Sequence, residues 1–323
     1  MRILVFGAGV LGSLYAAKLH RAGHSVALLA RGERLAALAT GGVQLEHALS
    51  GKKDMVRVPL VEELDERTAY DLILVLVRAD QLDSAAHTLG KHQASQNLLF
   101  MVNNPTGHAS VASAVGADRL MLGFAGAGGY RDGDLVKYVV LPGLLQPTTI
   151  GEPDGSETVR LTQARKAFRS AGFPVALNRT MDAWYRYHAA WVTPIAYAIY
   201  KARASDTFLA QEPKLLGEML AAIRELWASL SKLGLEITPP NLRLIQKLPD
   251  RILVPIVARA LSGRFADTAA YRHAEAAPAE MGLLASELTE IVRRAAIPTP
   301  SWERLFRGGE SVRISLATRG ESR

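Results

Sequence analysis

The pattern of hydrophobic and polar positions divides the chain into two halves. In the first half, residues 2–6, 25–29 and 71–77 are short apolar runs that predict buried strands, and DLILVLV at 71–77 is the clearest. Such near-continuous apolar strands are typical of a parallel sheet covered on both faces. Helical patterns at residues 10–21 and 83–89 separate the runs. This alternation predicts an α/β fold with a doubly wound sheet.

The other strands predicted in this half are less regularly spaced. They cover residues 43–46, 56–61, 97–102, 121–125, 135–141, 146–150 and 174–177, and a further helix is predicted at 157–171. The strands between residues 121 and 150 follow each other without long helices. We therefore expect this edge of the sheet to be antiparallel.

From Asp182 onward the apolar positions recur at helical spacing. Helices are predicted over residues 182–202, 212–233, 241–248, 252–260 and 279–295. Asp182 is suited to cap the first of them, and Pro298 and Pro300 are expected to close the last. The sequence thus predicts two domains, residues 1–178 and an all-helical domain of residues 179–323.

Composition narrows the class of protein. The 323 residues contain no cysteine, which excludes disulfides, thiolate metal sites and a cysteine nucleophile. The eight histidines show no metal-ligand spacing, so we expect no metal site. The net charge is +7, but without a block of like charges we expect no nucleic-acid partner. A net positive charge also suits an enzyme that binds an anionic cofactor and a small anionic substrate.

The lengths of the apolar segments bear on where the protein resides and on how it assembles. No signal peptide precedes the first strand, and the longest apolar runs, such as Leu72–Val77, are far too short to span a bilayer. We therefore expect a cytoplasmic protein without a membrane partner. The apolar helices of the second half are compatible with a homodimer, but also with the core of a monomer.

The first strand runs into a G-x-G-x-x-G turn at Gly7, Gly9 and Gly12, followed by a helix and a second strand. In a Rossmann-type unit the first glycine allows the tight turn, the second lets the backbone approach a pyrophosphate, and the third allows close packing of helix and strand. The helix start supplies free N–H groups for the phosphates. We assign cofactor contacts to Gly7, Ala8, Gly9, Val10, Leu11 and Gly12.

The end of the second strand indicates which dinucleotide binds. NAD sites usually carry an acid there, whereas this chain has Ala30 followed by Arg31, with Arg34 nearby. Arginine attracts a 2′-phosphate and can hydrogen-bond it with its fork, so we predict NADP(H). In the alternative, Arg31 is a solvated loop charge and Glu33 holds the ribose.

With these features the chain resembles the ketopantoate reductase (2-dehydropantoate 2-reductase) family over nearly its whole length. Residues 1–31 resemble the family's opening, including an arginine at Arg31. VLVRADQ (75–81) resembles a strand that ends in a lysine, here replaced by Arg78. VNNPTG (102–107) resembles the family's asparagine–glycine loop and places Asn103 on the asparagine. We assign both Arg78 and Asn103 to cofactor binding.

The resemblance continues toward the C-terminus. Residues 128–132 resemble a loop near the nicotinamide, so we place Gly129 at the cofactor. EMGLLASELTEIVRRAAIPTP (280–300) puts Glu280 on the family's acidic residue, which we assign to catalysis and cofactor binding. The family implies hydride transfer from NADPH to a 2-oxo acid in the cleft between the domains. In the family, a lysine acts as the general acid toward the substrate oxygen, and a glutamate, asparagines and a serine hold the substrate.

The chain departs from the family at the position of the catalytic lysine. When Thr193 and Pro194 are set on the family's asparagine–proline pair, the lysine position falls on Tyr185 and a substrate asparagine on Ala189. A slip of one residue would substitute Arg186, and residues 182–200 contain no lysine. The family's substrate serine falls on Thr268. We therefore assign Thr193 and Thr268 to substrate binding.

Two side chains are candidates for the missing acid. Tyr185 has a reference pKa near that of lysine, about 10, but it is equally an aromatic residue packed between domains. His188 lies three residues on, on the same helix face, and is either a proton donor near neutral pH or a buried structural histidine. Arg186 and Arg203 are carboxylate clamps or surface charges.

The predicted function is therefore an NADPH-dependent oxidoreductase that transfers hydride to ketopantoate or a related carbonyl or imine. Asn103, Tyr185, His188 and Glu280 are its candidate catalytic residues. The alternative is a sensor or pseudo-enzyme that binds NADP(H) without turnover.

Overall fold

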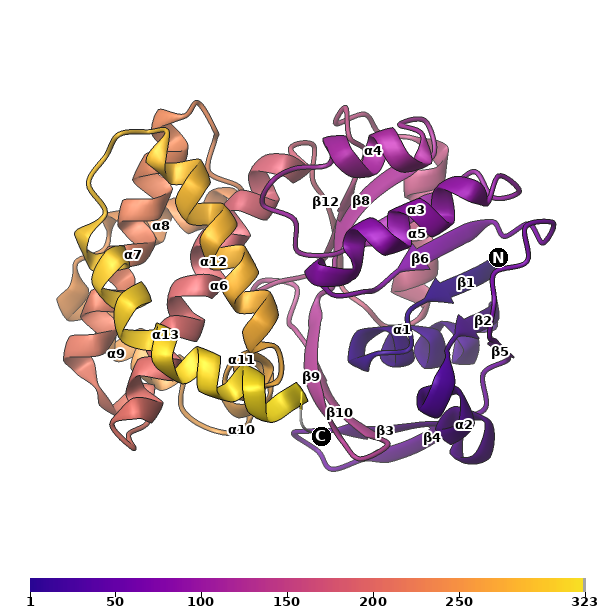
Figure 1. The fold of residues 1–323 in the computed structure, drawn as a ribbon, viewed down its shortest axis with the longest axis horizontal. Helices are drawn as coiled ribbons and strands as arrows, with labels where there is room; N and C mark the ends of the chain where they lie inside the picture. Colours follow the sequence, from indigo (N-terminus) through magenta and orange to yellow (C-terminus); the bar gives the residue numbers. More distant parts are fainter. Residues whose placement is uncertain (322–323) are drawn as a thin grey trace. The chain divides into compact units, whose positions relative to one another are not determined.

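A computed structural model describes residues 1–321 (Figure 1). The chain forms two compact units. The first, which we call the sheet unit, comprises Met1–Asn103 and His108–Met181. The second, the helical unit, comprises Asn104–Gly107 and Asp182–Arg323. The short segment 104–107 thus belongs by its contacts to the helical unit, although it lies between two parts of the sheet unit in sequence.

The sheet unit contains an eight-stranded main sheet. Its order is β5 (Leu60–Val61), β2 (Ser25–Leu29), β1 (Arg2–Phe6), β6 (Leu72–Val75), β7 (Leu98–Met101), β8 (Leu120–Phe124), β11 (Thr148–Gly151) and β12 (Val175–Leu177). The six strands from β5 to β8 are parallel, and β11 runs antiparallel to β8. The doubly wound sheet and its antiparallel edge are confirmed. The order of the strands reverses between β1 and β6, and such sheets bind ligands at this switch point.

Helices cover both faces of this sheet. They are α1 (Val10–Arg21), α2 (Gly32–Gly41), α3 (Leu82–Lys91), α4 (Ala109–Val115) and α5 (Val159–Ser170), with a 3₁₀ turn at Ala79–Gln81. In Figure 1, α3 and α4 lie on one side of the main sheet and α1 on the other. The short α4 was not predicted, because its seven residues are too few to show a helical period.

A second, four-stranded sheet corrects the prediction for residues 135–141. Its order is β4 (Lys53–Val56), β3 (Val43–His47), β10 (Leu135–Val140) and β9 (Ala127–Asp132). β10 therefore does not extend the edge of the main sheet. The residues near 128–132, expected as a loop, form β9. Gly128 and Gly129 suggest a turn in sequence, but a Cβ at Gly129 would lie 2.3 Å from the Lys137 carbonyl oxygen and 3.2 Å from Val10. Glycine here permits close backbone approach within a strand.

Tyr15 holds α1 in the core of the sheet unit. Its ring is fully buried and stacks on Phe173, with centroids 4.0 Å apart, while its hydroxyl hydrogen-bonds Thr148 at 2.6 Å. Burial raises the pKa of this hydroxyl. A buried aromatic ring with its polar atom satisfied fixes the helix in depth and in rotation. The start of α1 is positioned accordingly.

The helical unit confirms the predicted all-helical character. Its elements are α6 (Met181–Ala204), α7 (Pro213–Lys232), α8 (Arg243–Lys247), α9 (Asp250–Ala260), α10 (Arg264–Ala266), a π-helical segment (Asp267–Tyr271), α11 (Arg272–Ala276), α12 (Pro278–Arg293) and α13 (Pro300–Glu321), with 3₁₀ turns at Leu209–Gln211 and Pro240–Leu242. Pro300 does not close the preceding helix: it begins α13. Proline suits the first turn of a helix, where its missing N–H has no partner to lose.

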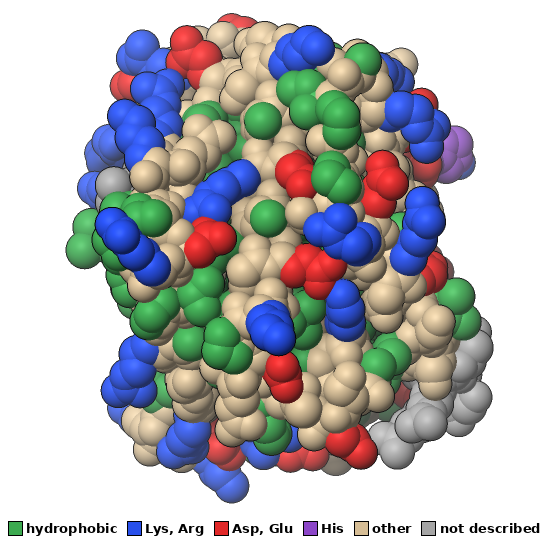
Figure 2. Space-filling model, turned by 90° about the vertical axis from the view of Figure 1, so that its left-hand side faces the viewer, with side chains coloured by type: hydrophobic (Ala, Val, Ile, Leu, Met, Phe, Trp, Pro, Cys, Tyr) green, Lys and Arg blue, Asp and Glu red, His purple; other side chains and the backbone are tan. Residues whose placement is uncertain are grey.

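Packing of α13 depends on two local features. The Glu225 carboxylate on α7 accepts hydrogen bonds from the backbone N–H groups of Ser301 and Trp302, which caps the start of the helix. Farther along, a Cβ at Gly309 would lie 2.8 Å from the Tyr197 ring, so glycine allows α13 to cross α6 closely. On the face shown in Figure 2, charged side chains of both signs are interspersed with hydrophobic ones. Within residues 1–321, no helix has the length and apolarity needed to cross a membrane.

Candidate cofactor and substrate sites

The predicted cofactor residues follow neighbouring strands at one edge of the main sheet. The last residue of β1, Phe6, is in register with Leu29 of β2 and Val75 of β6, and Val75 is in register with Phe100 of β7. Because these strands are parallel, the residues just after them meet at the same carboxyl edge. Those residues include Gly7, Arg31, Arg78 and Asn103.

The structure gives a different reason for glycine at each of the three positions of the fingerprint turn. A Cβ at Gly7 would lie 2.4 Å from the Leu76 carbonyl oxygen, and its φ of +114° disfavours other residues. A Cβ at Gly12 would lie 1.8 Å from the Gly7 carbonyl oxygen. A Cβ at Gly9 would meet nothing within 4 Å. The fold itself therefore requires Gly7 and Gly12 but leaves the space above Gly9 open.

The start of α1 is suited to bind an anion. Gly9 is its N-cap and supplies no side-chain cap, and the first turn holds no acidic residue. The N–H groups of a first helical turn have no partner within the helix and carry the positive end of its dipole. With the open space at Gly9, these features fit the pyrophosphate of a dinucleotide.

The structure separates the two arginines that follow β2. Arg31 is exposed at the N-cap position of α2, where its side chain makes no capping hydrogen bond, and its Nε donates to the Glu62 carbonyl at 3.4 Å. Arg34 points inward: its side chain is 13% exposed and its Nε donates to the Ala8 carbonyl at 3.2 Å. Glu33 is exposed in the first turn of α2. Arg31 is thus accessible to a ligand, whereas Arg34 is bound to the fingerprint turn.

Two further predicted residues extend this edge. The Arg78 side chain is 56% exposed and pairs with Asp80 at 3.3 Å. Asn103 comes two residues after β7, and the turn that follows is built by its neighbour: Asn104 Nδ2 donates to the Gly107 carbonyl at 2.6 Å, and its Oδ1 accepts from Thr106 at 2.8 Å. The structure therefore gives Asn104, which was not predicted, a structural role.

Tyr185 and His188 lie one turn apart on α6 and are both buried, with exposed fractions of 3% and 9%. The His188 ring stacks on Trp184 at 4.8 Å between centroids, and Trp184 meets Tyr185 edge to face at 6.0 Å. The three rings form one aromatic cluster. A proton-donor role for Tyr185 or His188 remains a prediction.

The predicted substrate hydroxyls are both used within their own helices. Thr193 donates to the Ala189 carbonyl at 2.8 Å, and Thr268 donates to the Arg264 carbonyl at 3.1 Å. Each hydroxyl oxygen retains the capacity to accept a hydrogen bond. Both side chains are buried, so any contact with substrate would be made away from bulk solvent.

Glu280 is buried at the third position of α12, with 7% exposure. Its charge reaches Tyr200, whose pKa is raised mainly by burial. Of the two candidate clamps, Arg203 is paired with Glu275 at 2.7 Å, and Arg186 Nη2 donates to the Thr106 carbonyl at 3.4 Å. Arg203 is therefore neutralised by a carboxylate, while Arg186 binds only a neutral group in that contact.

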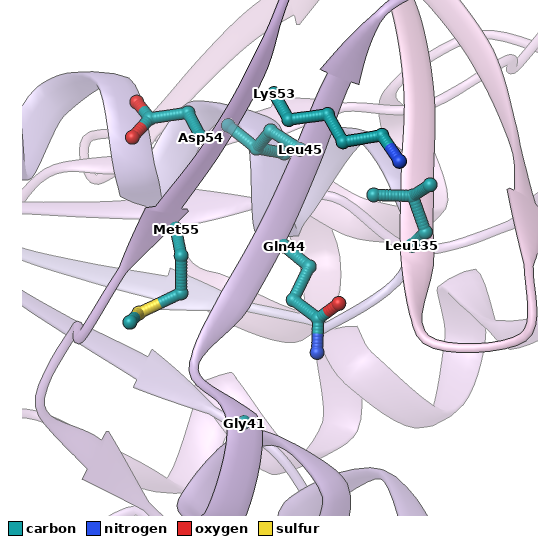
Figure 3. Close-up of a pocket in the computed structure, with 7 residues that line it drawn as sticks. All are labelled: Gly41, Gln44, Leu45, Lys53, Asp54, Met55 and Leu135. Carbon is teal, nitrogen blue, oxygen red and sulfur yellow. The ribbon is translucent and has the colours of Figure 1, made fainter.

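Two cavities lie away from all predicted site residues. One, of about 340 Å³, is on the second sheet and is drawn in Figure 3; its lining is Gly41, Gln44, Leu45, Lys53, Asp54, Met55 and Leu135. The other, of about 550 Å³, lies where α12 ends and α13 begins. The fingerprint turn, and not a cavity, is therefore the feature that indicates a cofactor site.

Comparison with known proteins agrees with this geometry. Residues 3–155 match the family model described as ketopantoate reductase PanE/ApbA. A 2-dehydropantoate 2-reductase of Vibrio cholerae is 34% identical over 115 residues, which cover 35% of each chain. Over residues 3–155, the chain is therefore similar to the ketopantoate reductase family. A family relative from Halobacterium salinarum, also a 2-dehydropantoate 2-reductase, is 28% identical over 185 residues, 55% of this chain and 58% of that protein. The matched segments thus span about one third to three fifths of these relatives.

The fold extends the similarity to the whole chain. A crystal structure titled as a ketopantoate reductase from Ralstonia solanacearum has a TM-score of 0.74 and 20% identity, covering 99% of this chain and 98% of that one. D-mandelate dehydrogenase in a ternary structure with NADH and anilino(oxo)acetate has a TM-score of 0.73 and 15% identity, covering 98% and 99%. Both likenesses concern the fold.

Proposed function

We propose that the protein is an NADPH-dependent oxidoreductase that reduces a 2-oxo acid to a 2-hydroxy acid. The observation that carries the proposal is the fingerprint turn: packing requires glycine at Gly7 and Gly12 but not at Gly9, where the open space fits the close approach of a pyrophosphate. Ketopantoate is the first candidate substrate because the family relatives are named for 2-dehydropantoate. D-mandelate dehydrogenase, which shares the fold, is named for another 2-hydroxy acid.

The bound nicotinamide would supply the hydride. The backbone N–H groups at the start of α1 hold the pyrophosphate, and the exposed guanidinium of Arg31 holds the 2′-phosphate. Asn103, at the carboxyl end of β7, orients a carbonyl or amide with its own amide group. Arg78, three residues after β6, is exposed, and its guanidinium would turn from Asp80 to an anionic cofactor or substrate.

NADPH is preferred over NADH in this proposal because Ala30, the residue after β2, is not an acid that could bind a free ribose hydroxyl. Fold similarity alone does not support this preference, since a neighbour of the same fold was solved with NADH. In our proposal Arg31 favours NADPH, because its guanidinium would contact the 2′-phosphate, which NADH lacks.

At the substrate, hydride attack on a ketone builds negative charge on its oxygen, and a positioned proton donor lowers that barrier. In our proposal Tyr185 donates this proton, with His188 as the second candidate on the same helix. Glu280 orients the substrate, and the hydroxyl oxygens of Thr193 and Thr268 accept hydrogen bonds from it. The burial of Tyr185 and Glu280 excludes water from these groups.

The test is NADPH oxidation, followed by the loss of reduced-nicotinamide absorbance, with ketopantoate and a panel of 2-oxo acids. We expect turnover with at least one of them, and a loss of at least about 100-fold in kcat for Tyr185→Phe. Glu280→Ala should raise KM as well as lower kcat. If Tyr185→Phe retains full turnover, the acid lies elsewhere, and His188→Gln is examined next. If NADPH binds but no acid is reduced, the protein is a binder of the cofactor and the reductase proposal fails.

A further inference from the structure

Arg34 is part of a closed set of hydrogen bonds on the fingerprint turn. Its Nε donates to the Ala8 carbonyl at 3.2 Å, and its Nη2 donates to Ser13 Oγ at 3.1 Å. Ser13 Oγ in turn donates to the same Ala8 carbonyl at 3.2 Å. We call Arg34, Ala8 and Ser13 the Ala8 triangle. With only 13% of the Arg34 side chain exposed, these hydrogen bonds are little weakened by solvent.

A fourth contact ties the triangle to the second sheet. Arg34 Nη1 pairs with Asp134 at 3.3 Å, in the turn between β9 and β10. Burial and the neighbouring Arg131 lower the pKa of Arg34, and the Asp134 carboxylate opposes this shift. The guanidinium is therefore held from three directions, by the fingerprint turn, by α1 and by the β9–β10 turn.

The triangle fixes the direction of one peptide plane. In a trans peptide the carbonyl and the following N–H point in opposite directions. When the Ala8 carbonyl is turned toward Arg34 and Ser13, the N–H of Gly9 points away from them. Gly9 is exposed and has open space around its Cα. A phosphate at this turn needs that N–H directed outward.

We propose that Arg34 is a positioning residue that holds the Ala8–Gly9 peptide in the orientation that binds the cofactor pyrophosphate. The proposal rests on the proposed function and gives the two arginines different tasks. Arg31 contacts the 2′-phosphate, which only NADPH has. Arg34 prepares the site for the pyrophosphate, which NADPH and NADH share.

The two tasks predict different patterns of binding. Dissociation constants of NADPH and NADH are measured on the full chain by the change in nucleotide fluorescence, without substrate. Arg34→Met should weaken both by the same factor, about 10-fold, as expected for loss of a charge-assisted hydrogen bond. Ser13→Ala, which keeps the arginine, should weaken both by about 3-fold. Arg31→Ala should weaken NADPH by at least about 10-fold and leave NADH unchanged.

Arg179→Ala is the matched control for the loss of one positive charge in the sheet unit, because its side chain is 75% exposed and pairs only with Glu157 among the contacts described. It should change neither constant. Thermal unfolding without nucleotide shows whether each variant is folded. Should Arg34→Met fail to fold, Ser13→Ala carries the test alone.

Two results overturn the proposal. If Arg34→Met weakens NADPH alone, Arg34 is a ligand of the 2′-phosphate and not a positioning residue. If folded Arg34→Met, or Ser13→Ala standing in for it, binds both nucleotides like the wild type, the triangle does not set the site. Failure of the wild type to bind either nucleotide is a different result: it refutes the proposed function, and the positioning role falls with it.

Discussion

Replacing each fingerprint glycine by alanine should separate folding from cofactor binding. At Gly9 the backbone has φ −72° and ψ −164°, which alanine adopts without strain, and the new Cβ meets no protein atom. Gly9→Ala should therefore leave stability unchanged or raise it by about 0.4–1 kcal/mol through the unfolded state. The methyl group would occupy the place of the pyrophosphate. We expect NADPH to bind at least about 10-fold more weakly, or about 1.4 kcal/mol.

Gly12→Ala should behave in the opposite way. Its Cβ would lie 1.8 Å from the Gly7 carbonyl oxygen and 2.9 Å from the carbon of that group. Against a normal separation of about 3.5 Å, the backbone must move by roughly 1.7 Å. Overpacking of this kind costs about 1–3 kcal/mol or more, which should lower the Tm by several degrees. Binding is lost as well, because the turn itself is displaced.

The assay pairs thermal unfolding with an NADPH titration for each variant. Gly217→Ala is the control, since Gly217 lies inside α7 with nothing within 4 Å of its Cβ. It should raise stability by about 0.5–1 kcal/mol and leave binding unchanged. The reasoning is refuted if Gly9→Ala binds NADPH like the wild type, or if Gly12→Ala unfolds at the wild-type temperature.

Two further predictions concern stability. The Glu152 carboxylate, 2% exposed, accepts two hydrogen bonds from Arg160, from Nε at 2.9 Å and from Nη2 at 2.6 Å. Arg160→Met should therefore lower the free energy of unfolding by about 3 kcal/mol in chemical denaturation, because it leaves a buried carboxylate unpaired. Removing the exposed Arg179 should cost at most about 1 kcal/mol, and equal costs would contradict this reasoning. Burial, together with the charge of Arg119, lowers the pKa of His92 below its usual 6.5. The unfolded chain then binds the proton more readily than the folded chain. The contribution of neutral His92 to the stability of the fold is therefore fully present above pH 6.5, and it declines as the pH falls through 6.5 toward the folded pKa. His92→Gln should reduce the drop in Tm between about pH 7 and pH 5, and an unchanged drop would show that other groups cause it.

The parts of the fold that sequence predicts are those encoded by local patterns. The spacing of Gly7, Gly9 and Gly12 between an apolar strand and a helix was sufficient to place the turn, and the run at 71–77 was sufficient to place β6. β9 was missed because its paired glycines resemble a turn. Their strand conformation depends on β10 and α1, and a local pattern does not report such partners.

Two other features could not be read from local patterns for the same reason. Proline before a helix and proline after one give similar local signals, so Pro300 was assigned to an end where the structure has the start of α13. The Ala8 triangle joins residues 8, 13 and 34, and its tie to Asp134 adds a fourth distant position. The sequence grouped Arg34 with Arg31, and only the structure separates their surroundings.

The most direct measurement of the central claim follows the hydride itself. The protein is incubated with NADPH carrying deuterium at the transferred position and with ketopantoate or another 2-oxo acid of the panel, and the product is analysed by mass spectrometry. Our account predicts a 2-hydroxy acid that carries one deuterium at C2, formed by the wild type and strongly reduced in Gly9→Ala. Bound NADPH with no labelled product from any 2-oxo acid would contradict it.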